Sequence, residues 1–209
     1  MSVRLRADID PGEIQTLIAI LREQGIHYLI ASAPPPPGAS TAVDPVELLL
    51  RLAGCNDPLV EHAVIALLIL HPELAPAAQE ALQRGEGEVR ERLATLILAT
   101  LYLQRWWLFR LAFALGRLPA FPEEPFASLW EERQLPPPSV DGGRAGLLAL
   151  EDYLQRRYGL PLNFMADWQN QIDHLLEQEE AKRRVIPSEV VEALREMSRQ
   201  ALQEPAQSE

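Results

Sequence analysis

The spacing of apolar and polar residues predicts a strand–helix–strand unit over residues 1–33. Apolar and charged residues alternate over 3–9, the period of two typical of a strand with one solvent-exposed face. Apolar residues then recur at helical spacing from Ile14 to Leu21, and Gly25 follows as a typical helix end. Residues 26–31 form a short apolar run rich in β-forming side chains. We expect the open strand edges to dock on the rest of the chain or to pair with another sheet.

Four consecutive prolines, Pro34–Pro37, separate this unit from the rest of the chain. Proline neither donates to a β-ladder nor fits a helix interior, so residues 34–43 are interpreted as a stiff linker. A ligand for an aromatic groove is the alternative interpretation of the same prolines.

Helical periodicity with very short connections dominates residues 44–116. The pattern predicts helices at 45–54, 58–70 and 72–84, each started by an Asp-Pro or His-Pro pair, and then a longer helix from Glu88 to about residue 115. Short connections favour antiparallel neighbours. The predicted fold is therefore mainly α, either a helical bundle or a short stack of antiparallel helical hairpins, beside the small N-terminal unit.

The long predicted helix leaves two questions about its surroundings. It would measure about 42 Å if straight, so it either forms a spine or bends. Residues 94–112 have the length of a membrane span, but Arg105 and Arg110 lie within it, and a central arginine costs about 2.5–3.5 kcal/mol on insertion scales. We expect a protein core around this helix and, because the sequence starts without a leader-like segment, a cytoplasmic location.

Two further regions complete the predicted organisation. Residues 117–143 are rich in proline yet contain three large aromatic residues, so we expect an ordered strap that wraps the helical body. Over residues 144–209 the spacing predicts helices at 146–157 and 164–180, and a last helix that starts at Pro187.

The last predicted helix carries one narrow apolar stripe. Val190, Leu194, Met197 and Ala201 follow a 4-3-4 spacing like that of a short coiled-coil seam. Such a stripe needs a partner, either the preceding helix of the same chain or another chain.

Composition and charge narrow the function classes. The 209 residues include 30 acidic and 19 basic side chains, a formal net charge of −11, which disfavours nucleic-acid binding. The four histidines lack the spacing of paired metal ligands, and nucleotide-cradle and esterase motifs are not present. We therefore expect no cofactor and no metal. The single cysteine, Cys55, is interpreted as a turn residue, with a nucleophile activated by His27 or His71 as the alternative.

Parts of the chain resemble known families. Residues 13–30 (EIQTLIAILREQGIHYLI) resemble the opening helix and strand of small nucleotidyltransferase domains, which implies a glycine-rich turn and paired metal-binding acids next; here alanine, serine and prolines follow instead. The helices between Asp44 and Phe113 resemble HEAT-like helical repeats. The whole layout is similar to uncharacterised helical proteins encoded beside bacterial nucleotidyltransferases, including antitoxin-like partners, which implies a non-catalytic accessory role.

Tryptophan and arginine crowd together on the long predicted helix. Adjacent residues on a helix point about 100° apart, so Trp106 and Trp107 do not both face one core, and exposed Trp with Arg is typical of interface hot spots. We therefore expect an interaction or regulatory subunit that binds another protein or a second copy. An enzyme of degenerate nucleotidyltransferase type and a DNA-binding regulator are the alternatives. The predicted partner-binding residues are Arg105, Trp106, Trp107, Arg110, Arg117, Phe121, Phe126 and Trp130.

Overall fold

The computed structural model describes residues 11–30, 43–159 and 163–184, and these residues form a mainly α fold. Short 3₁₀ turns precede three of the helices, over Pro72–Leu74, Glu124–Phe126 and Val140–Gly143. The α-helices are α1 (Pro11–Glu23), α2 (Pro45–Gly54), α3 (Pro58–Leu70), α4 (Ala75–Arg84), α5 (Gly87–Trp106), α6 (Leu108–Leu115), α7 (Ala127–Glu132), α8 (Arg144–Tyr158) and α9 (Phe164–Arg184).

Polar caps begin several helices at the predicted places. The Asp57 carboxylate accepts hydrogen bonds from the backbone N–H groups of Leu59 and Val60, at 2.9 and 3.2 Å. Asn163 does the same for α9, because its side-chain oxygen accepts from Ala166 N–H at 3.1 Å. These contacts satisfy N–H groups that have no partner within the helix, and so they fix where each helix starts.

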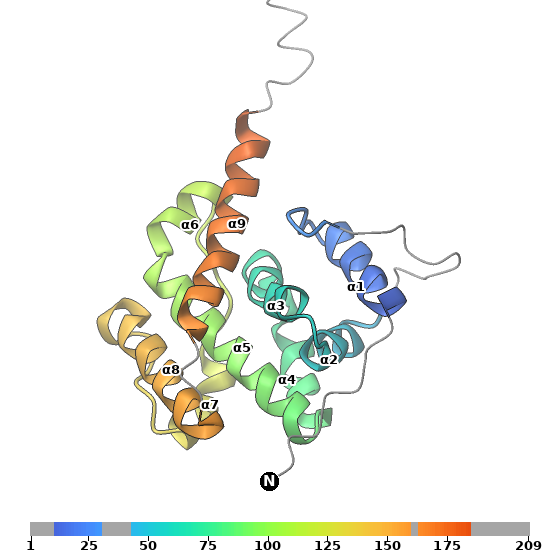
Figure 1. The fold of residues 1–209 in the computed structure, drawn as a ribbon. Coiled ribbons are helices and arrows are strands. Elements are labelled where there is room, and N and C mark those ends of the chain that lie inside the picture. Colours follow the sequence, from blue (N-terminus) through green and yellow to red (C-terminus); the bar gives the residue numbers. More distant parts are fainter. Residues whose placement is uncertain (1–10, 31–42, 160–162, 185–209) are drawn as a thin grey trace, which may run out of the picture.

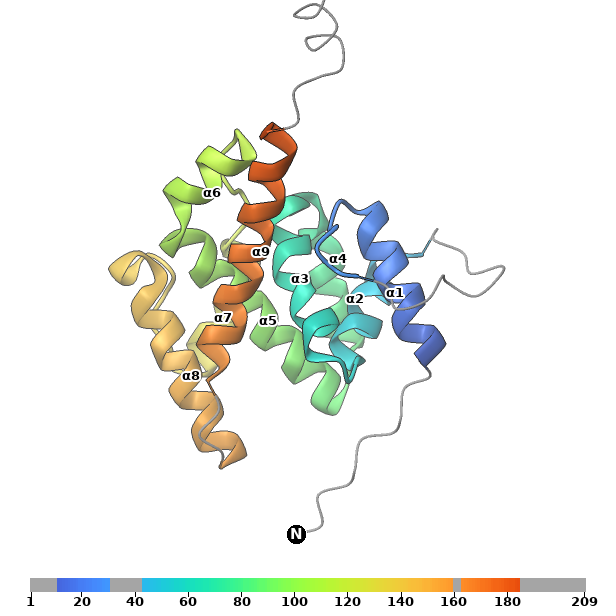
Figure 2. The same ribbon diagram turned by 45° about the horizontal axis from the view of Figure 1, so that its top comes forward.

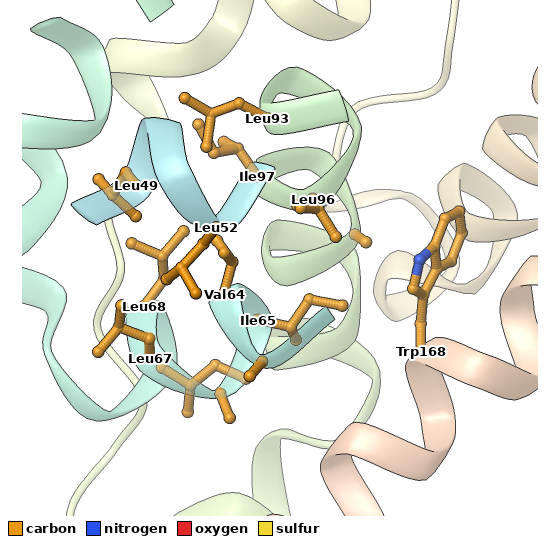
Figure 3. Packing of buried hydrophobic residues seen from close by; sticks show 14 of the residues in the cluster. Leu49, Leu52, Val64, Ile65, Leu67, Leu68, Leu93, Leu96, Ile97 and Trp168 are labelled. Carbon is orange, nitrogen blue, oxygen red and sulfur yellow. The ribbon is translucent and has the colours of Figure 1, made fainter. Parts of the chain in front are cut away.

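Helices α3 and α5 form the centre of the molecule. Figures 1 and 2 show α1 and α8 at opposite ends, with α3, α5 and α9 between them. Residues 63–69 of α3 and 93–104 of α5 are buried on all sides, which is expected for α3 because it is the most apolar helix. In Figure 3, side chains from α2, α3 and α5 meet in one cluster, and Trp168 of α9 lies beside it.

The predicted long helix is broken at Trp107. Helix α5 ends at Trp106, and α6 starts at Leu108 after a residue with φ −98° and ψ 17°. The second of the two alternatives is therefore correct, since the segment bends. Helix α6 leaves the axis of α5 and lies beside α9 (Figure 1).

The predicted strand over residues 26–31 is wrong for the part that the structure describes. Residues 26–30 form no strand; Ile26 and Leu29 are buried against the helices, while Ile30 is exposed. The backbone pairs with a side chain of α9 instead of a neighbouring strand: Gln178 accepts from His27 N–H and donates to the Gly25 carbonyl. This segment thus lacks the strand on which the nucleotidyltransferase resemblance rests. The first predicted strand, residues 34–42 of the predicted linker and the last predicted helix lie outside the described residues.

Consecutive helices do not all pair as antiparallel neighbours. The axis turns by 106° between Pro58–Leu70 and the following segment Pro72–Arg84, nearer to perpendicular than to antiparallel. His71 provides no side-chain cap at this corner, and a 3₁₀ turn leads into α4. The His71-Pro72 pair therefore predicts where α3 ends, but it does not predict the angle between α3 and the segment that follows.

No single helix among the described residues is both long and apolar enough to cross a membrane. The bent segment Pro58–Arg84 passes the same length and composition test only when two helices are taken together. Most of α3 is buried inside the protein, which accounts for its apolar composition.

The strap predicted over residues 117–143 packs against α5. Its 3₁₀ turn η2 (Glu124–Phe126) contacts α4, its helix α7 contacts α5, and its 3₁₀ turn η3 (Val140–Gly143) contacts α5 and α8. Gln104 of α5 donates to the Phe121 carbonyl at 2.8 Å, and the Tyr102 hydroxyl donates to the Pro136 carbonyl at 2.9 Å. Buried side chains of α5 thus hold the strap in place by hydrogen bonds to its backbone.

Candidate partner-binding surface

Helix α6 buries one side and exposes two aromatic rings on the other. Leu111 and Ala114 are buried, whereas Phe109 is 87% exposed and Phe113 is 73% exposed. The two phenylalanines are four residues apart, so they lie on the same side of the helix, one turn from each other. We call this pair the α6 aromatic face.

A shallow hollow of about 220 Å³ lies between this face and α9. It is lined by Phe109, Arg110 and Phe113 from α6 and by Leu176 and Glu180 from α9. Its lining is mostly apolar carbon, with charge at the rim. The arrangement suits an apolar side chain inserted between two helices.

Two arginines flank the aromatic face. The guanidinium of Arg183 lies 5.4 Å from the ring centroid of Phe113, and that of Arg110 lies 4.7 Å from the centroid of Trp107. Arg110 is also 3.9 Å from the carboxylate of Asp173 on α9. Cation–π contacts of this kind keep the guanidinium groups close to the aromatic rings.

The three predicted arginines are all engaged within the molecule. Arg105 pairs with Glu123 of the strap, and Arg110 approaches Asp173 as above. Arg117 donates to the carbonyl groups of Ile69 and Leu70 at 3.3 and 2.5 Å, so it caps the C-terminal end of α3. Of the three, Arg110 alone lines the hollow.

The predicted tryptophans are half-buried. Trp106 and Trp107 lie with ring centroids 5.6 Å apart and pack against the core, and Trp130 packs against it from the strap. The Trp107 indole nitrogen is buried with no acceptor among the described residues. The exposed aromatic rings on this part of the chain are therefore Phe109 and Phe113 rather than the indoles.

Phe121 and Phe126 belong to the core and not to an exposed surface. They are 2% and 1% exposed, and their rings stack with centroids 5.2 Å apart. A partner would reach neither ring without displacing the strap. Burial of the strap's aromatic residues against α5 explains why a proline-rich segment carries them.

The sequence contains a signal for Phe109 and Phe113 that the prediction did not use. Once the helix is restarted at Leu108, Leu111 and Leu115 fall on one side, and the two phenylalanines fall on another. If α5 and α6 are treated as one unbroken helix, the apolar side of residues 108–115 is assigned by continuing the apolar stripe of α5, and this pattern is missed.

The described residues offer no catalytic constellation of the kinds considered. Cys55 is buried, and burial raises the pKa of its thiol, which disfavours the reactive thiolate. The His71 ring nitrogens lie 2.8 Å from the Gln24 carbonyl oxygen and 2.9 Å from the Glu73 carboxylate. His27 is exposed at the surface. No group of three His, Cys, Asp or Glu side chains that could hold a metal ion is found in this part of the chain.

A second hollow, between the strap and α8, is lined by arginines whose charges are paired within the chain. Its lining includes Arg133, Arg156 and Arg157. Arg133 pairs with Glu91 at 2.9 Å, and Arg157 lies 3.8 Å from the same carboxylate. Arg156 pairs with Asp152 at 2.7 Å. The charges of this hollow are therefore largely balanced within the chain.

The part of the chain that the structure describes is an all-α fold with an exposed aromatic face. Comparison of the chain with protein-family models, curated proteins and solved structures found no match.

Proposed function

We propose that this chain is a non-catalytic interaction subunit that binds another protein through the α6 aromatic face. The observation that carries the proposal is the exposure of Phe109 and Phe113, at 87% and 73%, one turn apart on the same helix. Large apolar side chains left in water as a pair, beside an apolar hollow, are typical of binding surfaces.

The energetics of two phenylalanines favour a binding role. Burying one such side chain contributes about 1.5–3 kcal/mol, so the pair is sufficient for a hot spot. Arg110 and Arg183 stand at the edge of the face, and arginine beside aromatic rings is the composition enriched at interface centres.

The shape of the hollow favours a helical partner segment. A surface formed by two neighbouring helices receives the apolar side of a third helix, whose side chains at i, i+3, i+4 and i+7 enter the hollow. We therefore propose an amphipathic helix of a partner protein as the occupant.

The proposal is tested with a double substitution, Phe109→Ser with Phe113→Ser. The partner is first identified by affinity capture with the unmodified protein, and the binding of purified partner is then measured by titration calorimetry. We expect the double variant to bind at least about 30-fold more weakly, which corresponds to about 2 kcal/mol or more.

Leu148→Ser provides the matched control, because Leu148 is an exposed leucine on α8, away from the hollow. It is expected to bind as the unmodified protein does. Equal affinity of the Phe109/Phe113 variant and the unmodified protein, with helicity unchanged by circular dichroism, would refute the proposal.

A further inference from the structure

Helices α6 and α9 lie side by side and run in the same direction (Figure 1). The Arg110 guanidinium lies 3.9 Å from the Asp173 carboxylate. Further along both helices, the guanidinium of Arg183 lies 5.4 Å from the ring centroid of Phe113. The two helices thus form one layer, and the α6 aromatic face belongs to the exposed side of that layer.

The side of α9 that faces α6 has the same spacing when it is read from either end. Leu176 and Glu180 line the hollow, and Asp173 and Arg183 lie three residues outside them at either end. Residues three or four apart share one side of a helix, so these four positions form one stripe. Asp173 is half exposed, and Arg183 is exposed about 15 Å further along the helix. The hollow therefore lies midway between an acidic and a basic position.

We propose that two copies of this chain associate through the α6 aromatic face, about a two-fold axis that crosses the middle of the hollow. In this dimer α6 packs antiparallel on α6 of the second copy, and α9 packs antiparallel on α9 of the second copy. The inference rests on the proposed function, because it names a competitor for the same surface. A partner helix then binds a protomer that has left the dimer.

The two-fold axis brings opposite charges together. Asp173 of one copy comes opposite Arg183 of the second copy, and the symmetry repeats this pair at the other end of the interface. The Asp173 carboxylate accepts several hydrogen bonds, and its contact with Arg110 is as long as 3.9 Å, so it has capacity for a second cation. A net charge of −11 makes two copies repel each other in general. A surface that offers both signs, at matching positions, is therefore the one on which two copies meet favourably.

The same axis pairs the exposed aromatic rings. Phe109 of one copy comes opposite Phe113 of the second copy, and such rings attract each other in offset or edge-to-face contact. The two rings are 87% and 73% exposed, and a buried aromatic side chain removes about 150–250 Å² from water. The four rings of a dimer thus supply roughly 500 Å² or more of the approximately 1,000 Å² that a specific interface needs. The walls of the hollow and the arginine side chains beside it add to this area.

The test measures the mass of the full-length protein by sedimentation and light scattering at about 1–200 μM, a range that covers micromolar dissociation constants. We expect twice the protomer mass at the upper end. Asp173→Arg and Arg183→Asp each place like charges together at both ends of the interface, so each should weaken the dimer at least about tenfold. An equal mixture of the two variants should recover the dimer mass, because two bases of one copy then oppose two acids of the other.

Two charge reversals on α8 provide the matched control. Asp152→Arg and Arg156→Asp change the net charge by the same amounts, and they break an ion pair that does not line the hollow. Both are expected to dimerise as the unmodified protein does, and mixing them should change nothing. Circular dichroism checks that all variants keep their helicity.

Three outcomes overturn the inference. A protomer mass at every concentration shows that two copies do not associate. A dimer that both single reversals at Asp173 and Arg183 leave intact shows that the copies meet on another surface. Loss of the dimer in the single variants without recovery in their mixture shows that the two charges do not face each other across a two-fold axis.

The same proteins separate this inference from the proposed function. The single reversals keep both phenylalanines, so as monomers they should bind the partner more tightly than the unmodified dimer does. If the protein is a monomer but partner binding still requires Phe109 and Phe113, the inference fails and the proposed function stands. If the mixed variants dimerise but the partner binds without the phenylalanines, the proposed function fails and the face serves the second copy alone.

Discussion

The carboxylate of Glu91 on α5 joins three side chains from distant parts of the chain. It accepts from Arg133 Nη2 at 2.9 Å and from the Tyr153 hydroxyl at 3.3 Å, and Arg157 lies 3.8 Å away. The side chains of Arg133 and Glu91 are 10% and 16% exposed. A charge pair this far from water depends on each partner, because either charge alone would be buried without compensation.

Glu91→Gln tests this dependence. Removing the negative charge leaves the Arg133 guanidinium buried beside a neutral amide, so we expect a loss of about 3 kcal/mol in the free energy of unfolding, measured with urea. The control is Glu80→Gln on α4, where a half-exposed ion pair with Arg84 is removed and about 0.3–0.5 kcal/mol is expected. Equal losses in the two variants would contradict the structural account.

A second prediction at the residue scale concerns His62 of α3. Burial lowers the pKa of its imidazole, and the nearby charge of Asp167 on α9 opposes this only in part. The unfolded chain therefore binds the proton at a higher pH than the folded protein does. The free energy of unfolding is therefore independent of this residue's titration above its ordinary pKa of 6.5. Below pH 6.5 the free energy of unfolding decreases, until the pH reaches the lower pKa of the folded state.

His62→Gln is expected to flatten this part of the pH profile. The free energy of unfolding is measured by urea titration at several pH values between 7.5 and 5. Glu73, whose pKa is also lowered, does not obscure the effect, because its stabilisation is lost only at more acidic pH. A His62→Gln protein with the same slope as the unmodified protein would show that another group titrates.

At the scale of elements, the contact between α5 and α8 depends on Gly146. A β-carbon at this position would lie 2.1 Å from Cε1 of Tyr102, too close for any side chain. The absence of a β-carbon at Gly146 therefore leaves room for the Tyr102 ring beside α8, while the Tyr102 hydroxyl donates to the Pro136 carbonyl of the strap. Gly146 thus permits the close contact between α8 and α5 at Tyr102.

We expect Gly146→Ala to lower the free energy of unfolding by about 2–3 kcal/mol, because the ring or the helix must shift. Gly54→Ala at the end of α2 is the control, since its β-carbon would meet Val89 at an ordinary 3.7 Å; no loss is expected there. In a Tyr102→Leu background the Gly146→Ala cost should shrink, and a double-mutant cycle measures that coupling. Additive effects would rule out the clash.

Helix starts were the elements most open to prediction from sequence. Asp57 and Asn163 cap α3 and α9 as expected, because a cap needs only a few consecutive residues. The strand at residues 26–30 failed since its apolar pattern fits any buried extended segment; what decided the outcome was Gln178, about 150 residues away. The break at Trp107 carries no proline or glycine, so local sequence gave no marker for it.

The partner-binding surface stays a prediction, and the exposed aromatic side chains within it are not the ones that the sequence indicates. Residues 105–117 were indicated by Trp and Arg, and the exposed rings of Phe109 and Phe113 lie within that range. Helical periodicity does not predict which arginines form ion pairs within the chain. Arg105 pairs with Glu123 and Arg110 with Asp173, and both acids come from elements that only the tertiary fold brings close. The burial of Phe121 and Phe126 likewise depends on how the strap packs.

For the whole molecule, α9 connects the two ends of the described chain. Gln178 bonds the backbone at His27 and at Gly25, Tyr28 donates to Gln171 at 2.8 Å, and the ring of His174 stacks on Tyr28. Helix α9 also packs on α3, α6 and α8. The segment after α1 is thus held in place by a helix from the other end of the sequence.

Gln178→Ala is expected to release this segment. Two backbone groups lose their partner, so amide exchange at residues 25–30 should become faster, and global stability should fall by about 1–2 kcal/mol. Glu177→Ala, at an exposed neighbouring position, is the control and should change neither. Unaltered exchange at residues 25–30 in Gln178→Ala would show that Ile26 and Leu29 alone anchor the segment.

The position of α9 also bears on how the protein is made. The segment after α1 and helix α3 are translated early, whereas α9, which bonds the backbone at Gly25 and His27 and packs on α3, is completed only at Arg184. At synthesis rates of about 5–20 residues per second, these segments are without their contacts to α9 for about 6–30 s. During that interval the apolar side chains that pack against α9 are exposed on the nascent chain, and chaperones that bind exposed apolar segments have that time in which to act.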